Sequence, residues 1–364
     1  MSLNMVSSDL VSLDLLDHKV FTGQGALAEF FRWLAAGNNQ RKIAVLCDEN
    51  TVRHCFSVFS ALCPREITLH PLVIQSGEEY KTMDTAMRLW RDLSALQMER
   101  GDLLVNLGGG VVCDLGGFVA STYLRGIPFV HIPTSLLAQV DAAIGGKTGV
   151  DLDGMKNRVG LTVFPEAVYC FPGFMKTLPA VEWKSALAEV LKHALVKDAA
   201  LWSLLHEGIL MNDRVMELLP QIQLVKVEVV KEDPQEKGVR KVLNFGHTVG
   251  HAYESACLFS RQEPVPHGFA VALGMLVETD ISVEVSGLKV SEAEEISGMI
   301  TTVFGEMNLE MFTIDELLKW MQYDKKNRMG VLQFSLLKSI GHGVVNQSVP
   351  DGLVVDTLRK FGAQ

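Results

Sequence analysis

At 364 residues, the chain is long enough for two domains and too long for one simple hydrophobic core. Apolar residues make up 48% of it and charged residues 21%, which is ordinary for a soluble globular enzyme. The formal net charge of -10 argues against a general nucleic-acid or membrane-surface role, because both need a basic face.

The six cysteines are scattered and form no CxxC pair. This spacing predicts reduced, mostly buried thiols rather than a disulfide framework or a thiolate zinc site. The first residues carry no basic leader, and no run reaches the roughly 20 apolar residues that cross a bilayer. We therefore expect a cytoplasmic protein with no membrane partner.

The first half of the chain alternates strand and helix patterns. Four apolar, β-branched stretches predict buried parallel strands, at residues 42–50, 67–75, 102–110 and 128–135. A helical pattern covers residues 83–97. The alternation predicts a doubly wound, Rossmann-like α/β domain at residues 1–178, with ligands at the carboxyl ends of its strands.

Three of these strands end in residues that suit a nucleotide. The stretch "DLLVNLGGGVVCDLGG" is a strand, a triple glycine and a helix start, which can cradle a phosphate or form only a tight turn. Asp48 can accept from ribose hydroxyls, which favours NAD over NADP, or can cap a helix. Thr134 and Ser135 can likewise cap a helix or bind the cofactor.

Two further segments of this half carry charged residues. In "SGEEYK", Glu78 and Lys81 are best explained on sequence alone as a solvated, salt-bridged loop. Residues 139–157 place polar side chains among four glycines, in a segment too flexible to be stable alone. Such a segment favours a ligand loop for an anionic substrate, with a mobile surface loop as the alternative. Its candidate residues are Asp141, Lys147, Lys156 and Asn157.

The second half, residues 179–364, is expected to be a mainly helical domain. Segments with a 3.6-residue period predict helices, at residues 180–197, 212–231, 248–257 and 270–285. We expect the active site in the cleft between this domain and the first.

Glu189, with Lys192 three residues later on the same predicted helix face, has apolar neighbours and therefore needs a partner when buried. That partner is Lys192, a metal ion or both. His247 and His251 share a face of a later helix, and His267 precedes another. Any two of these histidines can complete a catalytic zinc site with Glu189, although a buried histidine can also be purely structural.

The motifs in their order resemble those of the 3-dehydroquinate synthase family, from about Asp48 to Gly343. They are GE-x-YK, GGGVV-x-D, TYLRG, PTS, VD-x-x-x-GGKTGV, KN, AEV-x-K, R-x-x-LNFGH-x-x-GH, HG-x-AVA-x-GM and DKK. The resemblance implies an NAD-binding α/β domain, a helical metal domain and a homodimer. It further implies one divalent metal ion, Zn2+ with Co2+ as the alternative, on Glu189, His247 and His267.

The same resemblance implies the other site residues. NAD contacts would come from Asp48, Ser76, Gly77, Glu78, Glu79, Tyr80, Lys81, Gly110, Val111, Val112, Cys113, Asp114, Thr134, Ser135, Lys147, Lys156, Phe174, Met175, Lys176, Thr177 and Leu178. Substrate contacts would come from Asp141, Lys147, Asn157, Lys192, Lys226, Arg240, Asn244, His251, Lys325 and Lys326. Arg125 resembles the arginine that reaches the neighbouring subunit's active site.

The implied reaction converts 3-deoxy-D-arabino-heptulosonate 7-phosphate to 3-dehydroquinate and phosphate, the second step of the shikimate pathway. It proceeds by NAD-dependent transient oxidation, β-elimination of phosphate, reduction and intramolecular aldol closure. The anionic substrate accounts for many lysines around one site in an acidic protein.

The sequence departs from the family pattern at two points. Phe269 occupies a position where the family usually has glutamate, so another group must orient His267 if that glutamate does so. The interval from His251 to His267 is also longer than is common.

Three alternatives remain open. The nearest is a sister sugar-phosphate cyclase, such as a 2-deoxy-scyllo-inosose or epi-valiolone synthase, which would use a substrate without the carboxylate. Retention of Lys147, Asn157, Arg240, Asn244 and His251 favours the carboxylated substrate. The others are a metal-dependent alcohol dehydrogenase and a non-catalytic binding protein on the same fold.

Overall fold

The computed structural model describes residues 4–7, 9–37, 41–153, 155–209, 211–259, 265–322 and 332–364. The chain divides into two compact units. The first unit comprises Met1–Pro179 and Lys226–Lys231, and the second comprises Ala180–Val225 and Glu232–Gln364. Helix α9 (Leu219–Glu232) therefore supplies residues to both units.

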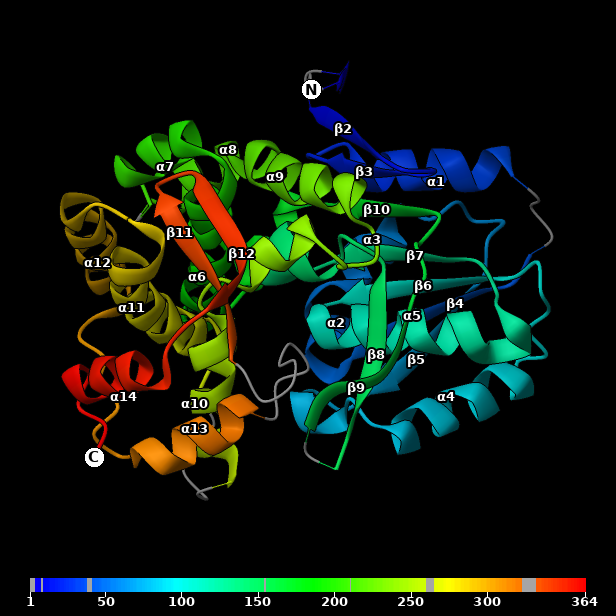
Figure 1. Ribbon diagram of the computed structural model, residues 1–364. Helices are drawn as coiled ribbons and strands as arrows, with labels where there is room; N and C mark the ends of the chain where they lie inside the picture. The colour runs from blue at the N-terminus through cyan, green and yellow to red at the C-terminus, as the bar shows by residue number, and fades with distance from the viewer. Residues whose placement is uncertain are drawn as a thin grey trace. The chain divides into compact units, whose positions relative to one another are not determined.

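An eight-stranded sheet forms the centre of the first unit, in the order β1-β2-β3-β10-β7-β6-β4-β5 (Figure 1). The strands are β1 (Asn4–Ser7), β2 (Leu10–Leu15), β3 (His18–Thr22), β4 (Ile43–Asp48), β5 (Leu69–Ile74), β6 (Leu103–Gly108), β7 (Phe129–Pro133) and β10 (Ala167–Cys170). The four predicted strands are confirmed as β4, β5, β6 and β7, and they pair in parallel.

At one edge of the sheet, for which we predicted no strands, β1, β2 and β3 pair antiparallel. Buried Leu13, Leu15 and Val20 alternate here with more exposed residues, which is the two-residue period of a strand with one covered face. The aspartates that interrupt this apolar pattern made the segment unlike the continuous apolar runs of the central strands.

Two hydrophobic layers cover the sheet, because alternate residues of each central strand point to opposite faces. Ile43 and Val45 belong to one layer, whereas Ala44 and Leu46 belong to the other. Helices α1 (Ala26–Ala36) and α3 (Phe56–Ala61) contribute to the first layer. Helices α4 (Met83–Ala95) and α5 (Gly110–Thr122) contribute to the second.

A second, two-stranded sheet replaces the flexible loop that we expected within residues 139–157. A π-helical turn, η3 (Ala138–Ala142), leads into the antiparallel strands β8 (Lys147–Leu152) and β9 (Met155–Thr162). A Cβ added to Gly149 would lie 2.7 Å from the Val159 carbonyl oxygen. The glycine therefore permits close strand pairing, and the segment forms a strand pair where we expected a loop.

The second unit is mainly helical (Figure 1). Its helices are α6 (Ala180–Lys197), α7 (Ala199–His206), α8 (Asn212–Glu217), part of α9, α10 (His247–Phe259), α11 (His267–Ser286), α12 (Val290–Phe304), α13 (Ile314–Gln322) and α14 (Asp351–Lys360). The unpredicted hairpin of β11 (Gln333–Ser339) and β12 (His342–Ser348) joins them.

The helix predicted at residues 212–231 is broken at Leu218, between α8 and α9. Pro220 lies in the first turn of α9, where a missing backbone N–H costs least, so the proline favours a new helix start. Among the described residues, no helix is both long and apolar enough to cross a bilayer.

Helices α10 and α11 pack very closely through glycines. A Cβ added to Gly274 would lie 1.9 Å from the Gly246 carbonyl oxygen, and one added to Gly250 would lie 2.8 Å from the Ala270 carbonyl oxygen. The two helices begin with His247 and His267. Their close packing lets both imidazoles reach the same place.

Candidate active site

A buried carboxylate and two histidines meet in the second unit. Glu189 on α6 is 1% exposed. Its Oε1 lies 3.4 Å from Nε2 of His247 and 3.7 Å from Nε2 of His267. One ligand atom from each of the three residues lies within 4.8 Å of the other two.

These donors fit a divalent metal ion. Two nitrogens and one oxygen are a common donor set of catalytic zinc, and two ligands of a tetrahedral zinc ion lie about 3.3 Å apart. Three protein ligands leave one position for another molecule. Lys192, the residue predicted to share a helix face with Glu189, forms an ion pair through Nζ with the other oxygen, Oε2.

His251 lies one helical turn beyond His247. Its ring centroid is 4.9 Å from that of His247 and 5.9 Å from that of His267. Among the described residues, a second group of possible ligands consists of His251, Glu254 and His267. His251 is therefore adjacent to the three-residue centre but is not grouped with Glu189.

The first turn of α10 is fixed by Glu278, a fully buried residue of α11 that the sequence prediction missed. Its Oε2 accepts from the Gly246 N–H at 2.6 Å. Its Oε1 accepts from the N–H groups of Thr248 and Val249 at 3.0 and 3.1 Å. The carboxylate thus accepts from backbone N–H groups that have no partner within the helix, on both sides of His247.

Glu254, also missed, lies beside His267, with Oε2 at 3.5 Å from Nδ1. Burial lowers the pKa of His267, but the carboxylates of Glu189 and Glu254 outweigh it and raise that pKa to about 9. The Phe269 ring carries no group that could accept a hydrogen bond from His267. It packs edge-on against Phe304 at 5.3 Å, with the Lys184 ammonium 5.4 Å from its ring.

Two other predicted substrate residues of this unit, Arg240 and Asn244, lie within a short helix, η5 (Val239–Asn244). Arg240 is buried and donates from a guanidinium nitrogen to the Pro234 carbonyl oxygen at 2.8 Å. Asn244 donates through Nδ2 to Oε1 of Glu236 at 2.9 Å. Lys325 and Lys326 lie outside the described residues.

In the first unit, Lys81 contradicts the expectation of a solvated loop, because it is only 3% exposed. Its Nζ lies 2.5 Å from Glu78, 3.5 Å from Asp114 and 3.6 Å from Asp151. It also donates to Oδ1 of Asn157 at 3.0 Å. Glu79 and Tyr80 lie within η1 (Glu78–Tyr80), which immediately precedes Lys81, and Ser76 and Gly77 immediately precede η1.

The charges in this network shift each other's titration. Burial lowers the pKa of Lys81, but the carboxylates of Asp114, Glu78 and Asp151 raise it overall. Burial raises the pKa of Asp114 to about 6, against the attraction of Lys81. The network connects the loop before α4 with α5 and with the β8–β9 hairpin.

Asp48 caps helix α2 (Glu49–His54), so the helix-cap alternative is realised. Its Oδ1 accepts from the N–H groups of Asn50 and Thr51 at 2.9 and 2.8 Å. Gly109 precedes α5, whose first turn holds Gly110, Val111, Val112, Cys113 and Asp114. The side chains of Val112 and Cys113 are buried, so these two residues could meet a ligand only through their backbone groups.

The remaining predicted residues of the first unit are dispersed over several elements. Ser135 Oγ accepts from the Ala138 N–H at 3.3 Å, and Thr134 is buried nearby in the chain. Lys226 Nζ lies 2.6 Å from Oδ1 of Asp141. Lys147 is exposed, and Lys156 Nζ lies 4.0 Å from Glu78.

The last predicted residues of this unit are those of segment 174–178, which has both buried and exposed side chains, and Arg125. Phe174 is buried within η4 (Pro172–Thr177) and packs edge-on against Phe171 at 5.1 Å, whereas Lys176 and Thr177 are exposed and Met175 and Leu178 are half-buried. Arg125 is exposed in η2 (Tyr123–Arg125), with a positive φ of 67° that a non-glycine residue rarely adopts.

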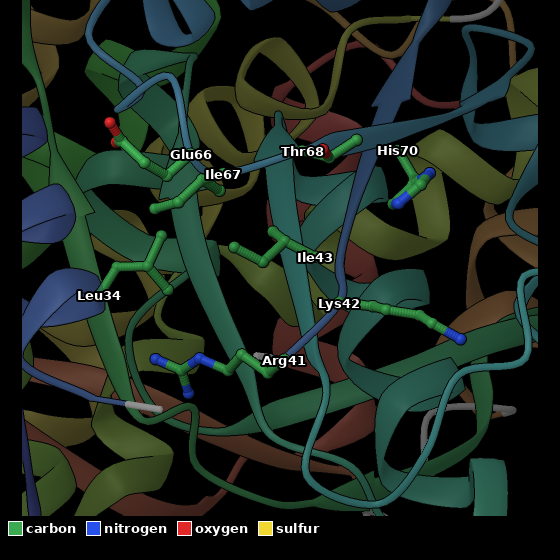
Figure 2. Close-up of a pocket in the computed structure, with 8 residues that line it drawn as sticks. All are labelled: Leu34, Arg41, Lys42, Ile43, Glu66, Ile67, Thr68 and His70. Carbon is green, nitrogen blue, oxygen red and sulfur yellow. The ribbon is translucent and has the colours of Figure 1, made fainter. Parts of the chain in front are cut away.

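A separate pocket of about 160 Å³ lies in the first unit, at the starting ends of β4 and β5. Figure 2 draws its lining residues, Leu34, Arg41, Lys42, Ile43, Glu66, Ile67, Thr68 and His70. None of them is a predicted site residue, and Asp48 lies at the other end of β4. This pocket is therefore distinct from the candidate cofactor loops.

Sequence comparison identifies the family. Residues 71–185 match the family model described as 3-dehydroquinate synthase N-terminal, and residues 186–327 match the one described as 3-dehydroquinate synthase C-terminal. The chain belongs to the 3-dehydroquinate synthase family. The resemblance of the motifs and the two-part fold class are thereby confirmed.

Individual members of this family are similar over nearly the whole chain. A 3-dehydroquinate synthase from Parabacteroides distasonis is 37% identical, over 87% of this chain and 90% of its own length. A 3-dehydroquinate synthase from Clostridium botulinum is 36% identical, over 93% of this chain and 97% of its own length.

Solved structures of related enzymes share the fold. A 2-epi-5-epi-valiolone synthase from Streptomyces hygroscopicus, solved with NAD+ and Zn2+, has a TM-score of 0.84 and 27% identity, over 98% of this chain and 99% of that one. An iron-containing alcohol dehydrogenase, at 15% identity over 96% and 98%, has a TM-score of 0.69 and shares the fold alone.

Proposed function

We propose that this chain is a 3-dehydroquinate synthase that converts 3-deoxy-D-arabino-heptulosonate 7-phosphate to 3-dehydroquinate and phosphate. Family membership supports the activity, and the buried group of Glu189, His247 and His267 is the structural observation that carries it. NAD and one divalent metal ion, Zn2+ or Co2+, are its cofactors.

Glu189, His247 and His267 would hold the metal ion. When bound, the metal supplies Lewis-acid polarisation of a substrate oxygen, and NAD supplies transient oxidation of the substrate carbon. Lys192 neutralises the second oxygen of Glu189, which lowers the cost of burying that carboxylate among apolar residues.

The chain's own residues would bind the anionic substrate and move its protons. Arg240 brings a permanent positive charge for its carboxylate and phosphate groups. Lys192 and Lys226 would contribute further through the N–H groups that their ion pairs with Glu189 and Asp141 leave over. His251 lies beside the two ligand histidines and can accept or return a proton near neutral pH.

The cofactor would lie along the first unit's strand ends. The start of α5 after Gly109 presents unpaired N–H groups to a phosphate. Lys81 is buried and paired with carboxylates, so we assign it to holding the cofactor loop against α5 and β8–β9 rather than to an open phosphate contact.

The test is phosphate release from 3-deoxy-D-arabino-heptulosonate 7-phosphate by metal-loaded protein with catalytic NAD, while NADH absorbance is followed. Stoichiometric phosphate without accumulated NADH is the expected result. NADH accumulation would instead indicate a dehydrogenase. No phosphate from this substrate, but turnover of sugar phosphates without the carboxylate, would indicate a sister cyclase, whose structural likeness makes it the second candidate.

We also propose a cytoplasmic homodimer in which Arg125 contributes to the partner's active site. Arg125 is exposed, which supports its contribution to a partner's active site. Five of the six cysteines are buried free thiols, which suits the reducing conditions of the cytoplasm. Light scattering should give twice the chain mass. Mixing an Arg125→Ala chain with an inactive His247→Ala chain should restore part of the activity, and no restoration would contradict sharing across the interface.

A further inference from the structure

His267 is the one residue of the proposed metal centre that faces a carboxylate at each ring nitrogen among the described contacts. Nε2 lies 3.7 Å from Glu189 and Nδ1 lies 3.5 Å from Glu254. Glu254 is 11% exposed by its side chain, so little water competes for its carboxylate. It lies outside the ligand set and outside the substrate residues proposed above.

We propose that Glu254 is a positioning residue, whose carboxylate orients the His267 ring so that Nε2 faces Glu189 and His247. This inference rests on the proposed metal site. A neutral imidazole has one N–H and one lone pair. An acceptor at Nδ1 holds the proton there and leaves the lone pair at Nε2, the nitrogen nearest the other two ligands.

The backbone at the start of α11 is fixed by other groups, so ring orientation is what remains for Glu254 to set. The Gly268 N–H donates to Ser185 Oγ at 2.9 Å, which joins the start of α11 to α6. A Cβ added to Gly268 would lie 1.7 Å from the Ser185 carbonyl oxygen, so the two backbones touch. These contacts place the His267 Cα but leave its side-chain torsions open.

Glu254 is well placed for this role because α10 itself is rigidly held. Glu278 fixes the first turn of α10 through three backbone N–H groups. Glu254 follows two turns later on the same helix. The carboxylate therefore comes from an element that is anchored independently of His267.

The side chain of Phe269 does not offer an alternative. Its ring contacts Phe304 and Lys184, and it carries no hydrogen-bond acceptor. The alternative role for Glu254 is direct metal ligation, because His251, Glu254 and His267 form a second group of possible metal ligands. Orientation predicts one metal ion per chain, whereas ligation predicts a second.

The experiment measures Zn2+ affinity and stoichiometry by competition with a chromogenic chelator. It compares the full-length wild-type chain with Glu254→Ala, Glu254→Gln and, as a control, Glu284→Gln. Glu284 is exposed on α11, the helix that begins with His267. We expect one ion per wild-type chain. Affinity should fall about 10–100-fold in Glu254→Ala and less in Glu254→Gln, whose amide oxygen still accepts from Nδ1.

Two further readouts separate orientation from general damage. The Co2+ absorption spectrum should change in Glu254→Ala and stay near that of wild type in Glu254→Gln. Circular dichroism and urea unfolding of the metal-free variants show whether the fold is intact. An intact Glu254→Ala chain with wild-type affinity and spectrum would overturn the inference and leave the proposed function standing.

Two other outcomes would also overturn it. Two ions in the wild-type chain and one in Glu254→Ala would make Glu254 a ligand. A wild-type chain that binds no ion would remove the proposed metal site itself, and that failure is visible before any variant is compared.

Discussion

In the first unit, the buried ammonium group of Lys81 lies among three carboxylates. In the second unit, by contrast, the buried carboxylate of Glu189 lies among one ammonium group and two imidazoles. The first arrangement contains its own permanent cation. In the second, the imidazoles can release a proton and take a metal ion in its place. Similar buried ion clusters can thus serve structure in one unit and chemistry in the other.

The largest expected effect is at the second cluster. His247→Ala removes one of the three proposed ligands, so bound metal and turnover should both be lost, with the rate lowered more than about 1000-fold. Lys147→Ala should abolish turnover but retain the metal. Metal analysis and phosphate release measure the two effects. His342→Ala, an exposed residue of the same unit, is the control and should match wild type.

Lys81→Met tests the structural role of the first cluster. It leaves three carboxylates close together without their cation, and we expect a loss of about 3–5 kcal/mol in the free energy of unfolding. Urea unfolding measures it. The control is Lys360→Met, which removes an exposed ion pair with Asp280 and should cost at most about 1 kcal/mol. A similarly small loss for Lys81→Met would contradict the contrast between the units.

Two buried histidines of the first unit, His18 and His131, have lowered pKa values, whereas the pKa of His267 beside its carboxylates is raised. Burial lowers the pKa of His18 to about 4, despite the charge of Asp17, and lowers that of His131 to about 3, from an ordinary value of 6.5. Unfolding lets both rings bind protons. Stability present above pH 6.5 is therefore lost as the pH falls, by about 2 kcal/mol for each histidine between pH 8 and pH 5.

His267 should show the reverse in metal-free protein. Its pKa is raised to about 9, so its contribution is present below pH 6.5 and is lost as the pH rises through 9. Urea unfolding between pH 5 and pH 9.5 measures both trends. His18→Phe should reduce the slope on the acid side, to which His131 still contributes, and His267→Gln should flatten the alkaline side. Unchanged profiles in these variants would show that other groups control the pH dependence.

The smallest expected effect separates two roles of Asp48. Asp48→Ala removes the cap of α2 and should cost about 1 kcal/mol of stability, whereas Asp48→Asn retains a capping oxygen. If Asp48 also binds the cofactor, the asparagine variant should keep its stability and lose affinity for NAD. Equal NAD affinity in wild type and Asp48→Asn would leave only the cap.

The sequence predicted those parts of the fold that have strong local periodicity. The helix expected at residues 180–197 matches α6, and the apolar strands β4 to β7 were expected from their composition. The β8–β9 hairpin was missed because its glycines resemble a loop until their close contacts are known. The β11–β12 hairpin carries no comparable pattern and was also missed.

The candidate site follows the same division. The residues alone suggested Glu189 with any two of His247, His251 and His267, and the family resemblance selected Glu189, His247 and His267. Glu254 could have been found, because it follows His251 by three residues on one helix face. Glu278 could not, because it reaches Gly246 from 32 residues away through the packing of α10 on α11. The burial of Lys81 could not be predicted either, because it depends on contacts with the distant residues Asp114 and Asp151.

Helix α9 limits how this chain can be recombined with its relatives. The two family sequence models meet at residues 185 and 186, within α6, but Lys226–Lys231 belongs to the first unit. A chimera joined there takes Asp141 from one parent and Lys226 from the other, although their charged atoms lie 2.6 Å apart. Parents that differ at either residue would give an unbalanced buried charge, so crossovers at this boundary require the pair to be inherited together.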